Sequence, residues 1–366
     1  MASPSLYNLS PLLPLLGVGA ALALLPLAWV WRRQRHTTPA QRLRALTLLT
    51  LFLTFDLVLF GAFTRLTDSG LGCPDWPGCY AYASPVGAGA EIDAAQRAMP
   101  SGPVTHGKAW VEMVHRYLAT GVGALIVLLL VLAWRGKSAR LVWPAMTLVW
   151  VCIQGAFGAL TVTMKLFPAI VTLHLLGGYA LLALLTVQSI RLSQPALRAV
   201  VLPTAFKVGI AMSLGWLMLQ AASGAWVSSN YAMLACTDFP QCQDQWWPAM
   251  TFEHGFELWR PLGLRSDGSP LTFQDLTAIH FGHRLLAGLT LLILGTLAWR
   301  LRTFPALQQP VRWLAALLGL QVLTGIGNVV LDGPLVTALL HTGGAAALMM
   351  VLVWLLAATH PPLERT

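Results

Sequence analysis

Long apolar stretches alternate with short polar segments along nearly the whole chain. A helix needs about 20 residues, at ~1.5 Å per residue, to cross a hydrocarbon core of roughly 30 Å. Nine stretches reach this length, and they cover residues 11–31, 44–66, 111–134, 141–163, 168–190, 206–228, 279–300, 311–331 and 335–357. The pattern therefore predicts an all-α polytopic membrane protein with about nine spans.

The charge pattern supports this prediction and indicates an orientation. Only 10% of the residues are charged, against about 25% in a typical soluble domain. The net charge of +9 does not indicate a nucleic-acid partner, because the basic residues cluster in short loops between the spans. We therefore predict a multi-pass protein with the amino terminus outside, the carboxyl terminus in the cytoplasm, and long outer loops at 67–110 and 229–278. The cytoplasmic basic set is Arg32, Arg33, Arg35, Arg42, Arg44, Arg135, Lys137, Arg140, Arg191, Arg198, Lys207, Arg300, Arg302 and Arg312.

An internal repeat divides the chain. Gly61 begins GAFTRLTDSGLGCPDWPGC and Gly224 begins GAWVSSNYAMLACTDFPQC, with the first Cys 12 residues after the Gly and the second Cys six later. VHRYLATGVGAL at Val114 likewise resembles GHRLLAGLTLLI at Gly282. Each unit has an even number of spans, so the two four-helix repeats share one orientation. We expect repeats at 44–192 and 193–366, preceded at 1–43 by an extra helix that lacks a signal-peptide cleavage site and by a basic loop.

Four histidines occupy matched positions within the spans: His115, His174, His283 and His341. Gln154 precedes His174 by 20 residues, and Gln321 precedes His341 by the same number. A single intramembrane His is readily explained as a hydrogen-bonded packing residue, but four at matched positions indicate ligands. Two imidazoles at similar depth on facing helices form a bis-His haem site. A zinc site would also need Cys or carboxylate ligands, and none is matched in both halves.

Charged residues close to these histidines differ between the halves. Glu112 stands three residues before His115 on the same helix face, whereas the matched residue before His283 is His280. A carboxylate near the iron is able to act as an acid or base; alternatively, Glu112 lies in the aqueous interface without a function. The candidates for contacts with haem propionates are Arg65, Arg116 and Arg284, although such arginines also simply extend toward the membrane surface.

The four loop cysteines form two pairs, Cys73 with Cys79 and Cys236 with Cys242. The oxidising exterior favours two structural disulfides. A four-cysteine metal site and a redox-active thiol pair are the alternatives. Cys152 lies within a span and is expected to be buried.

These features together resemble the haem A synthase family, in its bacterial form with paired outer-loop cysteines. The resemblance covers about residues 55–357 and depends on the first cysteine motif, EMVHR, the Gln154 to His174 spacing, HR at 283–284 and His341. It implies a membrane oxidoreductase of the bacterial inner membrane, which oxidises a ring methyl group of haem O to a formyl group by successive hydroxylation. The product, haem A, serves cytochrome oxidase.

The resemblance also implies roles for individual residues. His115 and His174 would be the axial ligands of the substrate haem O, and His283 and His341 those of a permanent haem B. Glu112 would be the catalytic residue. Besides haem O, the expected partners are an electron donor of unspecified class, haem O synthase and cytochrome oxidase assembly factors.

Two features depart from the family pattern. The span at 11–31 is extra to the eight-helix core, and the Gly- and Ala-rich residues 84–95 are expected to form a flexible insertion.

Two other functions compete with the synthase. A di-haem electron-transfer cytochrome that oxidises quinol predicts symmetric sites, and a haem transporter or chaperone predicts labile haem in both halves.

Overall fold

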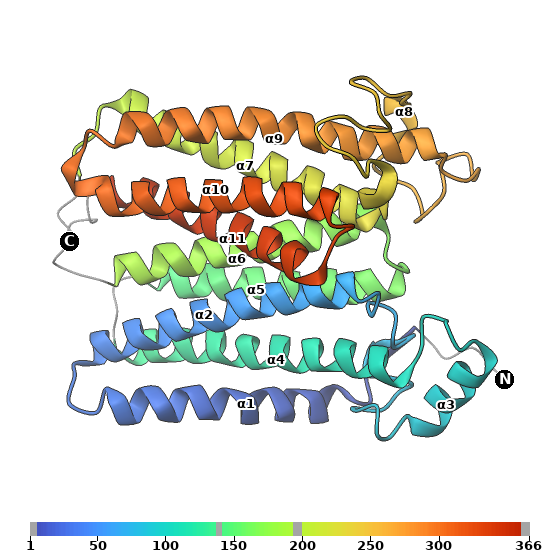
Figure 1. Ribbon diagram of the computed structural model, residues 1–366. Coiled ribbons are helices and arrows are strands. Elements are labelled where there is room, and N and C mark those ends of the chain that lie inside the picture. The colour runs from blue at the N-terminus through green and yellow to red at the C-terminus, as the bar shows by residue number, and fades with distance from the viewer. Residues whose placement is uncertain (1–5, 137–140, 193–199, 360–366) are drawn as a thin grey trace. The chain divides into compact units, whose positions relative to one another are not determined.

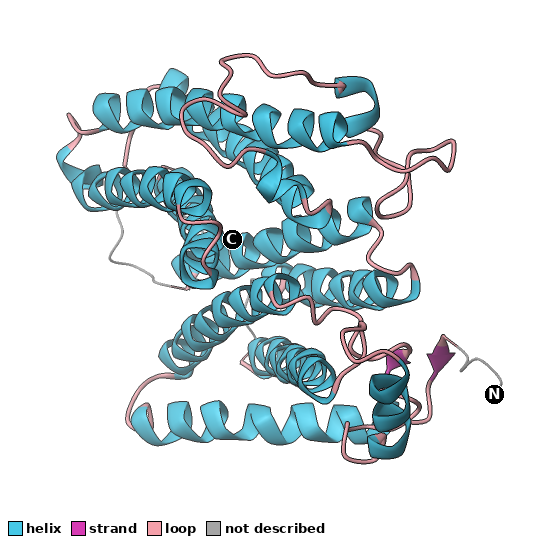
Figure 2. Cartoon of the chain, turned by 45° about the vertical axis from the view of Figure 1, so that its right-hand side comes forward, coloured by secondary structure: helices cyan, strands magenta, loops and turns pink. Residues whose placement is uncertain are grey.

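The structure is a computed structural model, which describes residues 6–136, 141–192 and 200–359. Among these residues almost all regular structure is helical (Figures 1 and 2). Two short strands, β1 (Tyr7–Asn8) and β2 (Trp76–Pro77), pair in parallel. The predicted basic-loop residues Lys137, Arg140 and Arg198 lie outside the described ranges.

Nine helices of the described chain are long and apolar enough to cross a membrane. This confirms the predicted all-α polytopic fold, including the extra first span. The nine are α1 (Leu12–Arg33), α2 (Pro39–Leu66), α4 (His106–Arg135), α5 (Val142–Thr163), α6 (Pro168–Arg191), α7 (Thr204–Ser229), α9 (Phe273–Leu301), α10 (Gln308–Val330) and α11 (Leu335–Ala358). The shorter helical elements are α3 (Gly89–Ala98), η1 (Ala232–Ala235), α8 (Phe252–Gly255) and η2 (Pro305–Leu307).

Several helices begin before their apolar stretches because polar residues cap them. Thr105 precedes α4, and its hydroxyl accepts a hydrogen bond from the Lys108 amide at 3.3 Å. Thr272 and Asp275 form a reciprocal capping box at the start of α9. Such caps satisfy amides that have no partner within the helix. They extend α4 and α9 beyond the predicted spans and into the outer loops.

The described residues fall into two compact units. The first is drawn from Met1–Leu166 with Ala180–Leu192, and the second from Phe167–Tyr179 with Ser193–Thr366. In the first unit α4 packs against α1, α2 and α5. In the second unit α7 packs against α9 and α11, and α10 packs against the same two helices. The boundary between the units therefore falls within α6, and the predicted repeat border at residues 192–193 stays a prediction.

Two local predictions are wrong. Residues 84–95 do not form a flexible insertion, because α3 begins at Gly89 and the Ile92 side chain is fully buried. Cys152 is exposed rather than buried. Within an apolar span, sequence alone does not separate a core-facing residue from a lipid-facing one, because both environments are apolar.

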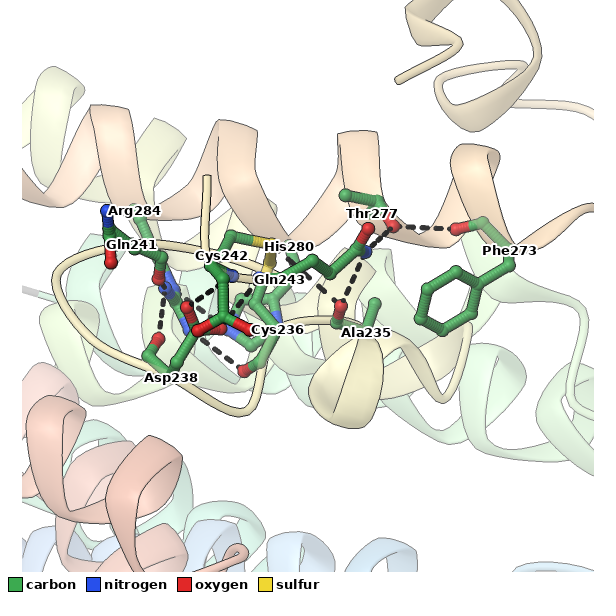
Figure 3. Close-up of a disulfide and its surroundings, with 11 residues drawn as sticks. Ala235, Cys236, Asp238, Gln241, Cys242, Gln243, Phe273, Thr277, His280 and Arg284 are labelled. Atoms are coloured by element: carbon green, nitrogen blue, oxygen red, sulfur yellow. Dashed lines mark hydrogen bonds between the residues drawn. A yellow bond between two sulfur atoms is a disulfide. The ribbon is translucent and has the colours of Figure 1, made fainter. Parts of the chain in front are cut away.

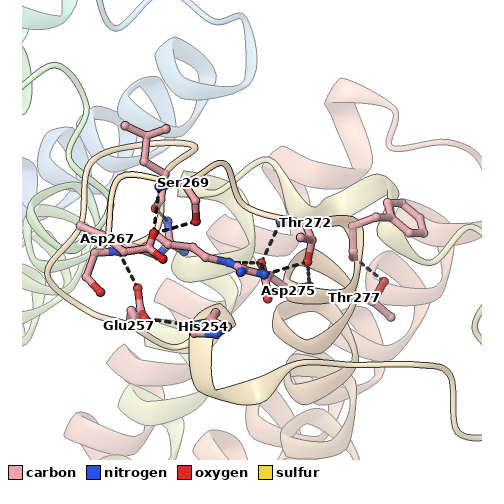
Figure 4. A network of polar contacts seen from close by, with 12 residues as sticks. His254, Glu257, Asp267, Ser269, Thr272, Asp275 and Thr277 are labelled. Atoms are coloured by element: carbon pink, nitrogen blue, oxygen red, sulfur yellow. Dashed lines mark hydrogen bonds and ion pairs between the residues drawn. The ribbon is translucent and has the colours of Figure 1, made fainter.

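The loop between α7 and α9, which the sequence predicts to lie outside, is held by polar contacts at the start of α9 (Figure 4). The buried Asp275 carboxylate accepts hydrogen bonds from Arg265 Nη2 at 2.8 Å and from the Thr272 amide at 2.7 Å. Glu257 accepts from the Ser266 amide at 2.8 Å, and its other oxygen lies 3.0 Å from His254 Nδ1. The His254 contact is the larger cause and the Ser266 amide the smaller one, and together they hold the pKa of Glu257 below its usual value.

Candidate haem-binding and catalytic site

Two disulfide loops have the same local structure in the two units. Cys73 pairs with Cys79, and Cys236 pairs with Cys242, which confirms the predicted pairing. Each loop has an Asp two residues after its first Cys and a cis peptide bond before its Pro. The bonds Trp76–Pro77 and Phe239–Pro240 stand at the same place in the two loops. The cysteine repeat is therefore a repeat of structure as well as of sequence.

The Asp residue of each loop closes the turn that follows the second Cys. The Asp75 carboxylate accepts hydrogen bonds from the Tyr80 and Ala81 amides at 2.6 and 2.7 Å. Asp238 accepts from the Gln243 and Asp244 amides at 2.7 and 3.0 Å. Burial acts to raise the pKa of the Asp238 carboxyl, but the amide donors outweigh burial and hold that pKa below its usual value.

An arginine on the adjacent helix donates hydrogen bonds to the backbone of each disulfide loop. On α9, Arg284 Nη1 donates to the Asp238 and Gln241 carbonyls, both at 2.8 Å, and Nη2 donates to the Cys236 carbonyl at 2.9 Å (Figure 3). On α4, the matched Arg116 donates to the carbonyls of Asp75, Pro77 and Gly78. Both guanidinium groups thus bind loop backbone, and their contact with haem propionates stays a prediction, as it does for Arg65.

Glu112 and His280 occupy the same position beneath these loops but have different chemistry. Glu112 is buried, with Oε1 bonded to Arg116 Nη2 and Oε2 accepting the Cys73 amide at 2.8 Å. His280 is also buried, and its Nε2 accepts from Arg284 Nε at 3.3 Å. Glu112 is therefore buried in protein and not solvated. A carboxylate and an imidazole occupy matched buried positions one helical turn before His115 and His283.

The structure brings together two of the four predicted ligands. The His283 and His341 rings lie 6.4 Å apart between centroids, with 83° between their planes. A metal ion bonded to two imidazoles at about 2 Å each places the ring centres roughly 6 Å apart. This spacing fits a single iron between the two rings. His115 and His174 fall in different units, so their predicted pairing stays a prediction.

The predicted second-unit ligands are held by hydrogen bonds that the sequence analysis missed. Ser223 Oγ and Gln220 Nε2 lie 2.8 and 3.1 Å from His283 Nδ1, and Thr324 Oγ1 lies 3.0 Å from His341 Nδ1. The Ser223 and Thr324 hydroxyls donate to the Gln220 and Leu320 carbonyls, so each hydroxyl oxygen is placed to accept from an imidazole Nδ1–H. A proton on Nδ1 leaves Nε2 for a metal. The orientations and the ring spacing therefore fit a bis-His haem.

The matched positions of the first unit have apolar residues instead. The repeat places Leu57, Phe60 and Phe157 opposite Gln220, Ser223 and Thr324. The Phe60 ring is nearly parallel to that of His115, with 6.2 Å between centroids and 7° between planes. A comparison of the two repeats at these three positions would have found the difference from sequence alone.

Glycines allow neighbouring helices to approach the histidine rings. A Cβ atom at Gly61 would lie 3.1 Å from His115 Cε1, and one at Gly224 would lie 3.0 Å from His283 Cε1. A Cβ at Gly325 would lie 3.3 Å from His341 Cε1. These contacts explain why the repeated motif begins with Gly. They also show that each ring packs directly on a neighbouring helix backbone.

Asp56 is a further polar residue that the sequence analysis missed. It lies on α2 within a membrane span and is exposed on the surface of the first unit. Phe60, which faces His115, is one turn away on the same helix face. Carboxylates in spans are costly and commonly functional, and this rule alone would have identified Asp56.

Residues 44–353 match the family model COX15-CtaA, described as cytochrome oxidase assembly protein. The chain belongs to this family. The four histidines, Glu112 and both cysteine pairs all lie within the matched residues, whereas α1 lies outside them.

Individual relatives share most of their length with this chain. It is 38% identical to the heme A synthase of Shewanella oneidensis, over 83% of this chain and 93% of that protein. It is 28% identical to the heme A synthase of Halalkalibacterium halodurans, over 78% and 86% of the two chains. For the heme A synthase of Alkalihalophilus pseudofirmus the identity is 26%, over 82% and 92%.

We predict that Arg284→Ala loosens the second disulfide loop. Three charge-assisted hydrogen bonds to loop carbonyls would be lost, each worth roughly 1.5–3 kcal/mol. Reduction of Cys236–Cys242 by dithiothreitol should become about tenfold faster or more, measured by alkylation and mass spectrometry. Cys73–Cys79 should react at its original rate.

Arg302→Ala is the matched control, because the Arg302 guanidinium stacks on Trp299 at the other end of α9. An unchanged rate for Cys236–Cys242 in Arg284→Ala would show that the arginine does not hold the loop.

Proposed function

We propose that this chain is a haem A synthase that oxidises a ring methyl group of haem O to the formyl group of haem A. Family membership and the names of the relatives support the reaction. Within the structure, the proposed reaction is supported mainly by Glu112, a buried carboxylate one helical turn from His115. The second unit has the same loop, arginine and histidine but has His280 in that position. Only the first unit therefore has a carboxylate in place for the oxidation chemistry.

Glu112 acts, in this proposal, as the group that takes up and releases protons beside the methyl group. Hydroxylation of a methyl group and the later loss of water both move protons. Arg116 and the Cys73 amide fix the two carboxylate oxygens, so the position of the carboxylate is set before substrate binds. His115 and His174 hold the iron of haem O, and Phe60 packs on the His115 ring.

His283 and His341 are proposed to hold a permanent haem B, which would supply one-electron transfer to the first unit. The ring spacing of 6.4 Å supports this assignment. The hydroxyl groups beside both Nδ1 atoms support it as well, because fixed imidazoles suit a permanent ligand. The apolar residues at the matched first-unit positions suit a haem that enters and leaves.

The setting of the reaction follows from the charge pattern. We propose the bacterial inner membrane, with the amino terminus and both disulfide loops outside and the carboxyl terminus in the cytoplasm. An electron donor of unspecified class, haem O synthase and cytochrome oxidase assembly factors are the proposed partners. No feature of the described residues favours the electron-transfer cytochrome or the haem transporter over the synthase.

We predict that His283→Ala or His341→Ala removes the retained haem B. Each change deletes one of two axial ligands, so the purified protein should lose its low-spin b-type absorbance spectrum. His106→Ala is the control, because His106 begins α4 in the first unit and pairs with the exposed Asp93. Retention of the spectrum in both ligand variants would contradict the assignment.

Ser223→Ala and Thr324→Val should have a milder effect on the same haem. Each removes a hydroxyl beside Nδ1 and leaves the ligand itself, so the haem should bind but dissociate faster, by about 10-fold. Transfer of haem to apomyoglobin measures this rate. Equal rates in the wild type and both variants would mean that the hydroxyls do not fix the ligands.

We predict that Glu112→Gln retains haem B and still binds haem O but loses at least about 100-fold in the rate of haem A formation. An amide has nearly the shape of the carboxylate but does not exchange protons in this way. Haem extraction and chromatography from cells that also make haem O would measure the product. Glu253→Gln, at an exposed carboxylate of the other outer loop, is the control. Normal haem A formation by Glu112→Gln would remove Glu112 from the mechanism.

A further inference from the structure

The residues that lead into the first span, together with the first turn of α1, lie directly on the first disulfide loop. In this segment, residues 6–15, Tyr7 and Asn8 pair in parallel with Trp76 and Pro77. The Trp76 amide donates to the Leu6 carbonyl at 3.1 Å. Two segments far apart in sequence therefore form one small sheet, seen beside the amino-terminal end in Figure 2. We call residues 6–15 the cover segment.

Side chains of the cover segment complete the contact. A Cβ atom at Gly78 would lie 2.6 Å from Pro11 Cγ, so Pro11 fits against this glycine. The Ser10 hydroxyl donates to the Ala81 carbonyl at 3.4 Å. The Tyr7 hydroxyl lies 2.9 Å from Thr163 Oγ1 at the end of α5. The cover segment is therefore bonded both to the disulfide loop and to the helical bundle of its own unit.

The disulfide itself lies in the core that the cover segment closes. Leu15, at 2% exposure, forms one buried cluster with Cys73, Cys79, Ile92 and Met113. Met113 is the neighbour of Glu112 on α4. This cluster unites α1, the disulfide loop, α3 and the part of α4 that includes the proposed catalytic carboxylate.

A close approach of α1 to α4 maintains this arrangement. A Cβ atom at Gly19 would lie 2.7 Å from the backbone carbon of Thr120, which leaves no space for a side chain. Gly121 on α4 lies beside Leu22, where a Cβ atom would be in ordinary van der Waals contact, 3.4 Å from Leu22 Cβ. Small residues at such crossings allow membrane helices to pack backbone to backbone.

The second disulfide loop is packed differently. Cys236 and Cys242 form a small buried cluster with Phe281, against which Met250 packs. All four residues come from the second outer loop and α9. The Asp turn, the disulfide and the arginine are common to both loops, whereas among the described residues the cover segment packs on the first loop. It also lies outside the residues that match the family model.

We infer that the cover segment is a positioning element of the catalytic site. By fixing the Cys73–Cys79 loop, it fixes the Cys73 amide that binds Glu112 and the carbonyls that bind Arg116. Arg116 in turn binds the other Glu112 oxygen. The inference rests on the proposed role of Glu112, but its structural part does not depend on haem chemistry.

Two variants with matched controls test the inference. Leu15→Ala removes a buried side chain beside the disulfide, and Leu16→Ala is its control because Leu16 is 51% exposed. Gly19→Ala forces α1 away from α4, and Gly17→Ala is its control because a Cβ there meets nothing within 4 Å. For each protein we would measure disulfide reduction, haem B content, and kcat and KM for haem O.

Leu15→Ala and Gly19→Ala should make reduction of Cys73–Cys79 about tenfold faster or more, with the rate for Cys236–Cys242 and the haem B content unchanged. The kcat for haem A formation should fall about tenfold or more with little change in KM, because the carboxylate is misplaced while the binding ligands remain. The two control variants should behave as the wild type does.

Other outcomes would overturn the inference in identifiable ways. Faster reduction of Cys73–Cys79 with a normal kcat would show that the cover segment shields the loop but does not position Glu112. Equal acceleration at both disulfides would indicate general unfolding and would also contradict a local role. Failure of the proposed function is distinguishable, because it appears as normal haem A formation by Glu112→Gln or as none by the wild type.

Discussion

The bonds from Arg116 and Arg284 to the disulfide loops above them are the interaction on which both candidate sites depend. Each guanidinium lies one residue after a proposed haem ligand and donates to three backbone carbonyls of its loop. A positive charge near the end of a membrane span is costly unless hydrogen bonds satisfy it. The loop supplies those bonds, and the disulfide and the Asp turn keep the carbonyls in place. The helix, the proposed ligand and the loop thus form one local arrangement, which is present once in each unit.

Gene duplication explains the shared frame, and a few substitutions inside it explain the proposed division of roles. In the first unit the disulfide loop and Arg116 enclose the Glu112 carboxylate, and Phe60 stacks on the nearby His115 ring. In the second unit the matched loop and Arg284 enclose His280, while Ser223 and Thr324 are hydrogen-bonded to the His283 and His341 rings. Polar partners stabilise a fixed imidazole. A chemical site and an electron-transfer site therefore need only a small number of differences.

Much of this was predictable from sequence, because the strongest signals are long or repeated. Apolar stretches of about 20 residues indicated the nine spans, and the spacing of Gly, Cys, Gln and His indicated the repeat and the cysteine pairs. The sequence also predicted that His283 and His341 lie on facing helices, and their rings are 6.4 Å apart between centroids. The pairing of His115 with His174 and the propionate contacts stay predictions.

Features that depend on tertiary packing were not predictable in this way. Residues 84–95 lack an apolar pattern strong enough to predict a helix, yet Ile92 is buried beside a disulfide and α3 forms around it. The pairing of Tyr7 with Trp76 depends on a return of the chain across α1, α2 and a loop. Exposure of Cys152 had no signal either, because lipid and protein core select the same residues. The hydroxyl partners of the second unit were visible in the repeat but required a position-by-position comparison.

The unequal covering of the two disulfide loops follows from the groups beneath them. A buried carboxylate costs several kcal/mol unless well-placed donors offset the loss of water, and Glu112 obtains its donors from Arg116 and from the loop amide of Cys73. Movement of that loop would remove one donor and displace the carbonyls that orient the other. At the matched position of the second unit, His280 Nε2 accepts from Arg284 Nε, and no amide of Cys236 is bonded to it among the described residues. The loop that donates directly to the buried carboxylate is also the loop on which residues 6–15 lie.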